Sequence, residues 1–196
     1  MSLFVILSKG GYTIIAIAIA AFIALYIVIE RFLYYRRTRE NTDELIRSIK
    51  PYLDDGDFTT AINILRQKNS PQAKVIVKGL LNKSRESMEA QAREEVKNLE
   101  KGIGVLSSVV AVSPMLGFFG TVVGMIRAFM QIESLGGSVN PSRLAGGIWE
   151  ALVTTAAGLA VAIIFLILYN ILVDRENTVV QEINRVMDEF SPYLGG

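Results

Sequence analysis

The sequence predicts an all-α integral membrane protein with three transmembrane helices and long helices that extend into the cytoplasm. Three stretches contain no charged residue, at 11–29, 103–126 and 151–173. Each has close to the ~20 residues that an α-helix needs to cross a hydrocarbon core of about 30 Å. Charged residues make up 20% of the chain, and they lie mainly between and after these stretches, as expected when membrane spans alternate with segments in water.

Composition excludes several classes of function. The chain contains neither cysteine nor histidine, which rules out thiol nucleophiles, disulfides, histidine-based triads and most transition-metal sites. No nucleophile is paired with a base, so we expect neither an enzyme nor a cofactor or metal centre. The net charge is +1 and no basic patch is interleaved with aromatic residues, so nucleic acid is not an expected partner.

The first predicted span, residues 11–29, is followed by Glu30 and Arg31 and then by a basic cluster of Arg36, Arg37 and Arg39. Residues 31–101 hold 15 of the 20 Lys and Arg residues. Because the positive-inside rule places such residues in the cytoplasm, the N-terminus is predicted to lie outside and residues 31–101 in the cytoplasm. A cleaved signal peptide is the less favoured alternative, since the apolar run continues past the alanines that resemble cleavage sites.

The cytoplasmic segment is predicted to form a small domain of about three short helices. Their starts have good capping residues; these are Asn41 with Glu44 three residues on, Asp57, and Ser70 followed by Pro71. Gly56 marks the end of the first helix, and Pro51 is expected to kink that helix or end it early. The charges of this domain form either a docking surface or a solvated face, and the solvated face is favoured.

From Ser84 a charged helical pattern runs without a turn signal into the second span, with pairs such as Glu89 and Arg93 at i,i+4 spacing. We therefore predict one continuous helix over 84–132, roughly 70 Å long. Within it Gly117, Gly120 and Gly124 lie on one face, which favours close packing of another helix.

Two further residues of the second span have distinct expectations. Pro114 is predicted to bend the helix locally. Thr121 either bonds its own preceding carbonyl or lines a pore, and composition alone does not decide between the two.

The third span follows an outside turn at 134–140, and Asn140 with Pro141 is predicted to cap it. Glu150 stands at the head of its uncharged run. A carboxylate at membrane depth costs about 2.5–3.5 kcal/mol, so Glu150 is expected to face a polar interior or a partner. Thr154, Ala157, Gly158 and Val161 lie within about 40° of it on a helix and form a small, weakly polar stripe.

After Val173 an amphipathic cytoplasmic helix is predicted, with apolar residues at Val180, Ile183, Met187 and Phe190. It is expected to pack on its own chain or on a neighbouring subunit. The predicted segments are an N-terminal segment with the first span at 1–33, cytoplasmic helices at 34–102, the second span at 103–132, a periplasmic loop at 133–141, the third span at 142–173 and the C-terminal helix at 174–196.

Two blocks of the sequence resemble the MotA/TolQ/ExbB proton-channel family, and specifically its three-span ExbB/TolQ branch. Residues 114–126 read PMLGFFGTVVGMI and residues 147–159 read GIWEALVTTAAGL. They are similar to the family patterns P-x-x-G-L-x-G-T-V-x-G and G-I-x-E-A-L-x-x-T-A-x-G-L. The order of the predicted elements along the whole chain agrees with the same branch.

This resemblance implies a homopentamer in the lipid of the inner membrane, with a periplasmic N-terminus and a cytoplasmic C-terminus. The second and third spans would line a central pore. A single-span partner similar to ExbD or TolR would sit within it and carry the proton on a membrane aspartate. A TonB- or TolA-like protein would pass the energy to an outer-membrane process.

The family's pore residues correspond here to Thr121, Glu150 and Thr155. Thr155 lies about 140° around the helix from Glu150, so the two residues do not both point straight at a pore axis unless one lies at a subunit boundary. Thr154 shares the face of Glu150 and is a partial substitute. The remaining residues of interest are assigned to helix packing; they are Pro114, Gly117, Gly120, Gly124 and Gly158.

The resulting hypothesis is that protons move down their gradient through the pore and drive motion of the partner, with Thr121 and Thr155 as hydrogen-bonding neighbours. The main alternative is a passive membrane scaffold in which Glu150 pairs with an arginine of a partner and nothing flows. A small-solute transporter is disfavoured because three spans show no inverted repeat, and a flagellar stator because that branch has an additional span. The sequence leaves open ExbB-type or TolQ-type work, and proton or sodium as coupling ion.

Overall fold

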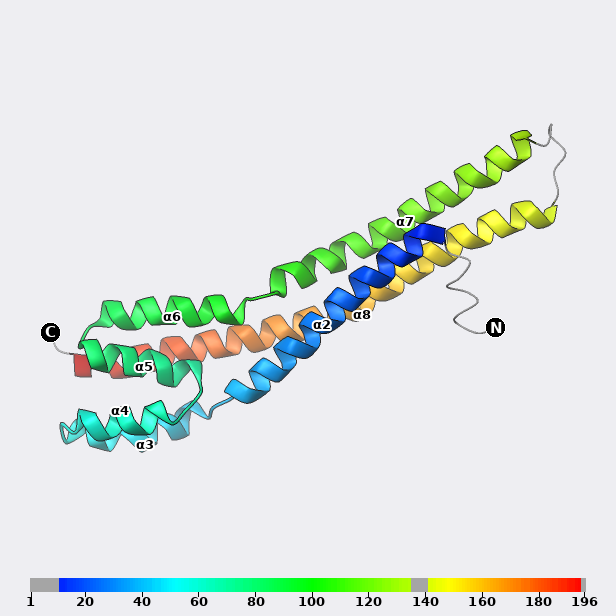
Figure 1. The fold of residues 1–196 in the computed structure, drawn as a ribbon. Helices are drawn as coiled ribbons and strands as arrows, with labels where there is room; N and C mark the ends of the chain where they lie inside the picture. Colours follow the sequence, from blue (N-terminus) through cyan, green and yellow to red (C-terminus); the bar gives the residue numbers. More distant parts are fainter. Residues whose placement is uncertain (1–10, 135–140, 195–196) are drawn as a thin grey trace. The chain divides into compact units, whose positions relative to one another are not determined.

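The computed structural model describes residues 11–134 and 141–194, whose regular secondary structure is entirely helical (Figure 1). The helices are α2 (Gly11–Thr38), α3 (Thr42–Asp54), α4 (Phe58–Arg66), α5 (Pro71–Asn82), α6 (Arg85–Leu99), α7 (Ile103–Ser134), α8 (Pro141–Phe190) and the 3-10 helix η1 (Ser191–Leu194). The all-α prediction is confirmed for this part of the chain. The predicted turn at 135–140, with Asn140 as cap, lies outside the described residues.

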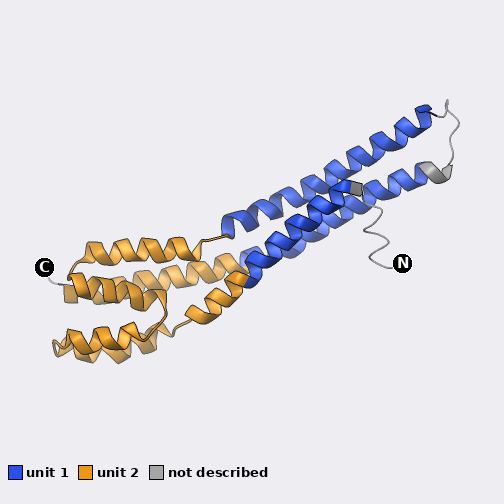
Figure 2. Ribbon diagram, in the orientation of Figure 1, with its two compact units in different colours: residues 1–29, 103–170 blue, residues 30–102, 171–196 orange. Residues whose placement is uncertain are grey.

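The chain divides into two compact units (Figure 2). Unit 1 comprises residues 1–29 and 103–170, and unit 2 comprises residues 30–102 and 171–196. Three helical segments are long and apolar enough to cross a membrane, and they contain the apolar parts of α2, α7 and α8. These parts belong to unit 1, which confirms the three predicted apolar spans.

The core of unit 2 is formed by large apolar side chains from five helices. The largest buried ones include Leu45, Ile49, Leu65, Ile76, Met88, Leu99, Ile183 and Phe190. The last two belong to the end of α8, so the amphipathic helix predicted after Val173 packs on its own chain. It is the continuation of the third apolar helix, because α8 runs without a break from Pro141 to Phe190.

Three short helices of unit 2 begin at their predicted caps, where the side chain accepts a hydrogen bond from a backbone N–H three residues on; these are Asn41 from Glu44, Asp57 from Thr60 and Ser70 from Ala73. Ser84 caps α6 in the same way, by accepting from Ser87 N–H. Helix α3 does not end at Pro51 but continues to Asp54. Gly56 follows with φ +78°, a conformation that glycine adopts without strain.

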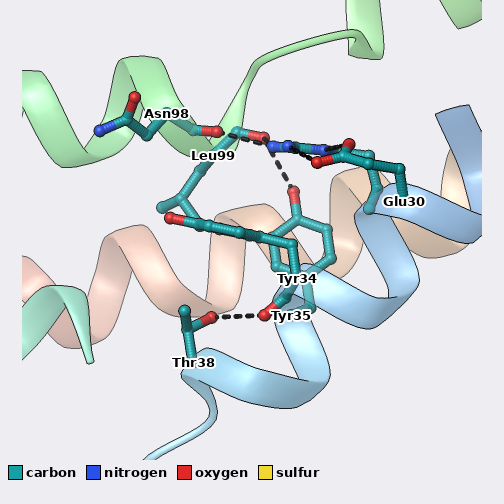
Figure 3. Close-up of polar contacts among 7 residues, drawn as sticks. Glu30, Tyr34, Tyr35, Thr38, Asn98 and Leu99 are labelled. Carbon is teal, nitrogen blue, oxygen red and sulfur yellow. Dashed lines mark hydrogen bonds and ion pairs between the residues drawn. The ribbon is translucent and has the colours of Figure 1, made fainter. Parts of the chain in front are cut away.

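The continuous helix predicted over 84–132 is wrong, because the chain breaks between α6 and α7. In an unbroken helix the carbonyls of Asn98 and Leu99 would accept from backbone N–H groups four residues on. Here Arg31 Nη1 donates to Asn98 O at 2.7 Å and Tyr35 Oη donates to Leu99 O at 3.1 Å. Gly102 then turns the chain with φ +83°. Figure 3 shows Tyr35 of α2 beside Asn98 and Leu99.

This break depends on residues more than sixty positions earlier in the sequence. Arg31 is almost fully buried, at 3% exposed, and also pairs with Glu30 at 2.5 Å. A guanidinium that satisfies helix C-terminal carbonyls complements the negative end of the helix dipole. Gly102 is the one local signal of this break, whereas the side chains that bind the end of α6 come from a distant part of the sequence.

Candidate functional site

The candidate site is the seam between α7 and α8 in unit 1, where glycines let the two backbones meet. A Cβ placed on Gly117 would lie 3.0 Å from the carbonyl oxygen of Thr154, and one on Gly124 would lie 3.0 Å from Ala151 Cβ. On Gly158 it would lie 2.5 Å from the carbonyl oxygen of Ser113. Real Cβ atoms essentially never approach other atoms that closely, so only glycine permits this spacing at Gly158.

Gly120 lies on the side of the seam that faces α2. A Cβ there would lie 2.5 Å from Thr154 Oγ1 and 2.8 Å from Thr13 Oγ1 of α2. Thr154 is completely buried between these helices, and its hydroxyl donates to its own helix at Ala151 O, 2.7 Å away. The structure therefore places Thr154 in the packed interior of the three helices.

Thr121 and Thr155 form a hydroxyl pair across the seam. Thr121 Oγ1 donates to Ala151 O of α8 at 3.1 Å, and Thr155 Oγ1 donates to Gly117 O of α7 at 3.0 Å. The two hydroxyl oxygens also contact each other. Because each hydroxyl has one proton but is within reach of a carbonyl and of the other hydroxyl, the proton positions can rearrange without moving either helix.

The hydroxyl pair is only half-buried in the single chain. Thr155, and not Thr154, is thus the threonine of α8 that lies beside Thr121. Glu150 and Thr155 lie about 140° apart around α8, and each side chain therefore has a different partner on α7. Thr155 meets Thr121, whereas Glu150 meets a different residue of α7.

That residue is Arg127, which sequence reasoning did not single out. Its Nη1 lies 3.3 Å from Glu150 Oε1, with the side chains 48% and 28% exposed. The signal was present in the sequence: Arg127 directly follows the uncharged run of the second span, seven residues after Gly120, and so shares one helix face with it. Arg127 is the only Lys or Arg residue between Ile103 and Ser134.

The ion pair lines a cleft of about 350 Å³ between the two helices. Gln131 and the glycines Gly124, Gly146 and Gly147 complete most of its wall. Because the glycines have no side chains, the cleft is lined by backbone, by the small side chain of Ala128 and by three polar side chains.

The two pairs differ in depth. Thr121 lies eighteen residues from Ile103, and Thr155 eighteen residues from Val173, about 27 Å along each helix. Glu150 is about 35 Å from Val173 by the same measure. A hydrocarbon core of about 30 Å that began at Ile103 and Val173 would contain the hydroxyl pair and would end near the ion pair, at an interface where charges cost least.

Pro114 and Ser113 lie in the half of α7 nearer to Ile103. Helix α7 continues through Pro114, which has no N–H to donate to the carbonyl four residues earlier. Ser113 is fully buried, and its hydroxyl donates to Val109 O at 2.6 Å. Ser113 thereby presents its backbone, and not its side chain, to Gly158.

Comparisons with known proteins agree with these features. The model of the MotA/TolQ/ExbB proton channel family matches residues 61–185. An ExbB homolog of Methanothermobacter thermautotrophicus is 33% identical over 91% of this chain and 65% of its own length. An ExbB-like protein of Synechocystis is 30% identical over 86% of this chain and 70% of its own. The Tol-Pal system protein TolQ of Haemophilus influenzae is 35% identical over 66% of this chain and 55% of its own length. The chain thus spans between 55% and 70% of these relatives' lengths.

Proposed function

The chain belongs to the MotA/TolQ/ExbB proton channel family, in its ExbB/TolQ branch, and we propose that it is a subunit of a motor driven by the proton-motive force. It is an all-helical, multi-pass membrane protein. The proposed location is the inner membrane, with the N-terminus in the periplasm and unit 2 in the cytoplasm. The excess of Lys and Arg in residues 31–101 supports this orientation.

The proposed assembly is a pentamer in which α7 and α8 face a central pore. A single-span partner of the ExbD or TolR kind occupies the pore, and a TonB- or TolA-like protein carries the energy outward. The exposed apolar surface of α7 supports an assembly of this sort, because Phe118, Phe119 and Phe129 are each more than half exposed in the single chain. Such a surface requires lipid or another helix to cover it.

The Thr121–Thr155 pair carries the functional part of the proposal. It is a half-buried pair of hydroxyls that meet across the two helices, with protons that have more than one possible acceptor. Hydroxyls of this kind both donate and accept, and so they can pass a proton or orient a water beside a titrating carboxylate. In the proposed motor that carboxylate belongs to the partner.

Valine and serine variants of Thr121 test this role. Thr121→Val keeps the shape and removes the hydroxyl, whereas Thr121→Ser keeps the hydroxyl. In proteoliposomes containing the chain and its co-purified partner, we expect the valine variant to lose about tenfold or more of the proton flux, as is typical for loss of a proton-transfer group. The serine variant should retain flux, and a pH-sensitive dye inside the vesicles provides the measurement.

Ser108→Ala is the matched control, because the Ser108 hydroxyl of α7 donates only within its own helix, to Gly104 O. Native mass is measured in parallel, and five copies of 21.6 kDa give 108 kDa. If Thr121→Val assembles at the wild-type mass and conducts protons like wild type, the hydroxyl pair has no role in conduction.

A passive scaffold remains the second candidate, in a changed form. Glu150 pairs with Arg127 of its own chain and not, as the scaffold hypothesis expected, with an arginine of a partner; an ion pair within one chain is nevertheless what a purely structural role requires. The scaffold predicts that Glu150→Gln lowers the thermal stability of the complex and leaves proton flux at its background level, the same as in wild type. The motor predicts a wild-type flux above that background.

The protein that binds on the periplasmic side distinguishes the two kinds of work within the branch. Cross-linking of the intact complex in cells identifies it. A partner that reaches a nutrient transporter supports ExbB-type work, and one that reaches peptidoglycan-linked lipoproteins supports TolQ-type work.

A further inference from the structure

A larger cleft, of about 690 Å³, lies within unit 2, the orange unit of Figure 2. The end of α2, the first turn of α3, the start of α5 and one face of α8 form the wall of this unit 2 cleft. On α8 it extends from Arg175 to Arg185, about 15 Å along the helix. The volume is typical of a site for a small molecule.

Two oxygen atoms at the unit 2 cleft lack a hydrogen-bond partner among the described residues. They are Thr42 Oγ1 and Gln72 Oε1, and both residues line the cleft. Thr42 is 4% exposed and Gln72 is 1% exposed. Buried polar atoms are nearly always paired in folded proteins, because an unpaired one has lost its hydration without replacement. A ligand with an O–H or N–H group would supply the missing donor.

The orientation of the Gln72 amide is fixed by its other polar atom. Nε2 donates to Glu182 Oε2 at 2.6 Å. A carboxylate only accepts hydrogen bonds, so the reversed amide would place its oxygen against another acceptor. Gln72 Oε1 therefore points away from Glu182 and must find its donor elsewhere.

The carboxylates of the unit 2 cleft are already engaged. Glu40 pairs with Lys68 at 3.1 Å, and Asp43 pairs with Arg185 at 2.6 Å. The third carboxylate, Glu182, accepts the amide bond described above. Their negative charges are thus largely compensated and do not keep an anion out of the cleft.

Two arginines that line the unit 2 cleft, Arg39 and Arg175, form no ion pair within residues 11–134 and 141–194. The guanidinium of Arg175 lies over the ring of Phe32, with Cζ 5.2 Å from the ring centroid. This stacking uses the face of the guanidinium and leaves the N–H groups at its edge for an oxyanion, which they bind as a planar fork.

We propose that the unit 2 cleft binds a small oxyanion, a phosphate ester or a carboxylate, that also carries O–H or N–H donors. Arg175 and Arg39 attract the oxyanion, and Thr42 Oγ1 and Gln72 Oε1 accept from the donors. The site is separate from the Thr121–Thr155 pair and does not depend on the proposed motor.

Two sources supply this chemistry. One is a soluble phosphate ester, and the other is the headgroup of an anionic phospholipid. Arg175 comes two residues after Val173, where the uncharged run of α8 ends, and this places one end of the cleft near the membrane surface.

Isothermal titration of the purified full-length chain with glycerol phosphate tests the soluble source. Wild type should bind it saturably, whereas glycerol, which lacks the anion, should not bind. Arg175→Gln should weaken binding at least about tenfold, as expected for loss of a charge-assisted hydrogen bond. Arg37→Gln is the matched control, because Arg37 is an exposed arginine of α2 outside the cleft lining. Arg39→Gln repeats the test in case Arg175→Gln does not fold.

Thr42→Val separates ligand binding from a structural role. Valine keeps the shape of threonine and removes the unpaired hydroxyl, so the variant should melt at the temperature of wild type or above it. It should nevertheless bind glycerol phosphate about fivefold more weakly, because one acceptor is lost. A purely structural threonine predicts the opposite, a lower melting temperature with unchanged binding.

Native mass spectrometry from nanodiscs of phosphatidylcholine and phosphatidylglycerol tests the lipid source. Phosphatidylglycerol that is retained by wild type and by Arg37→Gln, but lost from Arg175→Gln, assigns the cleft to a lipid headgroup. Saturable binding of glycerol phosphate without retained lipid assigns it to a soluble ester. If wild type binds neither, or if Arg175→Gln and Arg37→Gln behave alike in both experiments, the proposal is wrong.

Discussion

The α7–α8 seam and the core of unit 2 are both helix–helix contacts, but different interactions hold them together. At the seam, glycines bring two backbones together and threonine hydroxyls donate across to carbonyls. In unit 2, leucine, isoleucine and phenylalanine side chains fill a core, and side chains cap the helix ends. The seam buries small residues and leaves large ones such as Phe118 outside, whereas large side chains fill the core of unit 2.

The solvent explains this difference. Lipid tails are as apolar as leucine, so burying a large apolar side chain between membrane helices gains little, and close packing and interhelical hydrogen bonds dominate. In water the burial of apolar surface is the main driving force. The contrast supports the proposal that unit 1 lies in the membrane and unit 2 in the cytoplasm.

The largest expected effect is at the seam, from Gly158→Ala. A Cβ there would lie 2.5 Å from the carbonyl oxygen of Ser113, and a backbone atom gives way far less easily than a side chain. We expect the two helices to be forced apart at a cost of about 3 kcal/mol. Unfolding in detergent mixtures, followed by Trp149 fluorescence, measures it.

Gly104→Ala is the matched control, because a Cβ on Gly104 meets nothing within 4 Å. Its stability should equal or slightly exceed that of wild type. Equal effects of the two alanine variants would mean that close backbone approach does not hold the seam.

A smaller effect is expected from Arg31→Met, which removes the donors to the end of α6 in unit 2. The Asn98 carbonyl then loses a charge-assisted hydrogen bond, worth about 2 kcal/mol. Tyr35→Phe removes one neutral hydrogen bond to Leu99 O and should cost about 1 kcal/mol. Hydrogen exchange of the α6 amides measures both effects. A larger loss of protection from Tyr35→Phe than from Arg31→Met would show that Tyr35 contributes more to fixing the end of α6.

The stability of unit 2 is expected to depend on pH through Glu176. Burial, and then the negative charge of Glu100, raise the pKa of Glu176 above its ordinary value of 4.5. The folded state thus binds this proton more tightly than the unfolded state. The resulting stabilisation is fully present below pH 4.5 and is lost as the pH rises through the folded-state pKa.

Glu176→Gln stays neutral at every pH and should keep that stability. Its melting temperature should therefore exceed that of wild type by an amount that grows as the pH rises from about 4.5 to 7. Glu100→Gln removes only the second cause and should give a smaller gain. A constant difference between Glu176→Gln and wild type over this range would contradict the assignment.

The smallest expected effect is a gain of about 0.5 kcal/mol from Lys83→Gly. Lys83 ends α5 in the left-handed region at φ 46°, where glycine is not strained. Lys78→Gly in the same helix is the control and should lose about 1 kcal/mol, because Lys78 lies within the helix. Thermal unfolding of the two variants should shift in opposite directions.

Much of the fold follows from patterns within a few residues of each other. The apolar spans, the caps at Asn41, Asp57 and Ser70 and the glycine face at Gly117, Gly120 and Gly124 are local features. They were predictable because lipid thickness, helix geometry and unsatisfied N–H groups act on consecutive residues. The family resemblance added the polar residues of the spans but not their partners.

The sequence by itself therefore determined the helices, the spans and the face of α7 that packs. Only the tertiary structure decided that Thr155 meets Thr121, that Glu150 meets Arg127, and that α6 ends at Leu99. Each of these depends on a side chain from another helix, more than twenty residues away. Helical periodicity predicts which residues share a face, but packing of the whole unit determines which residues contact that face.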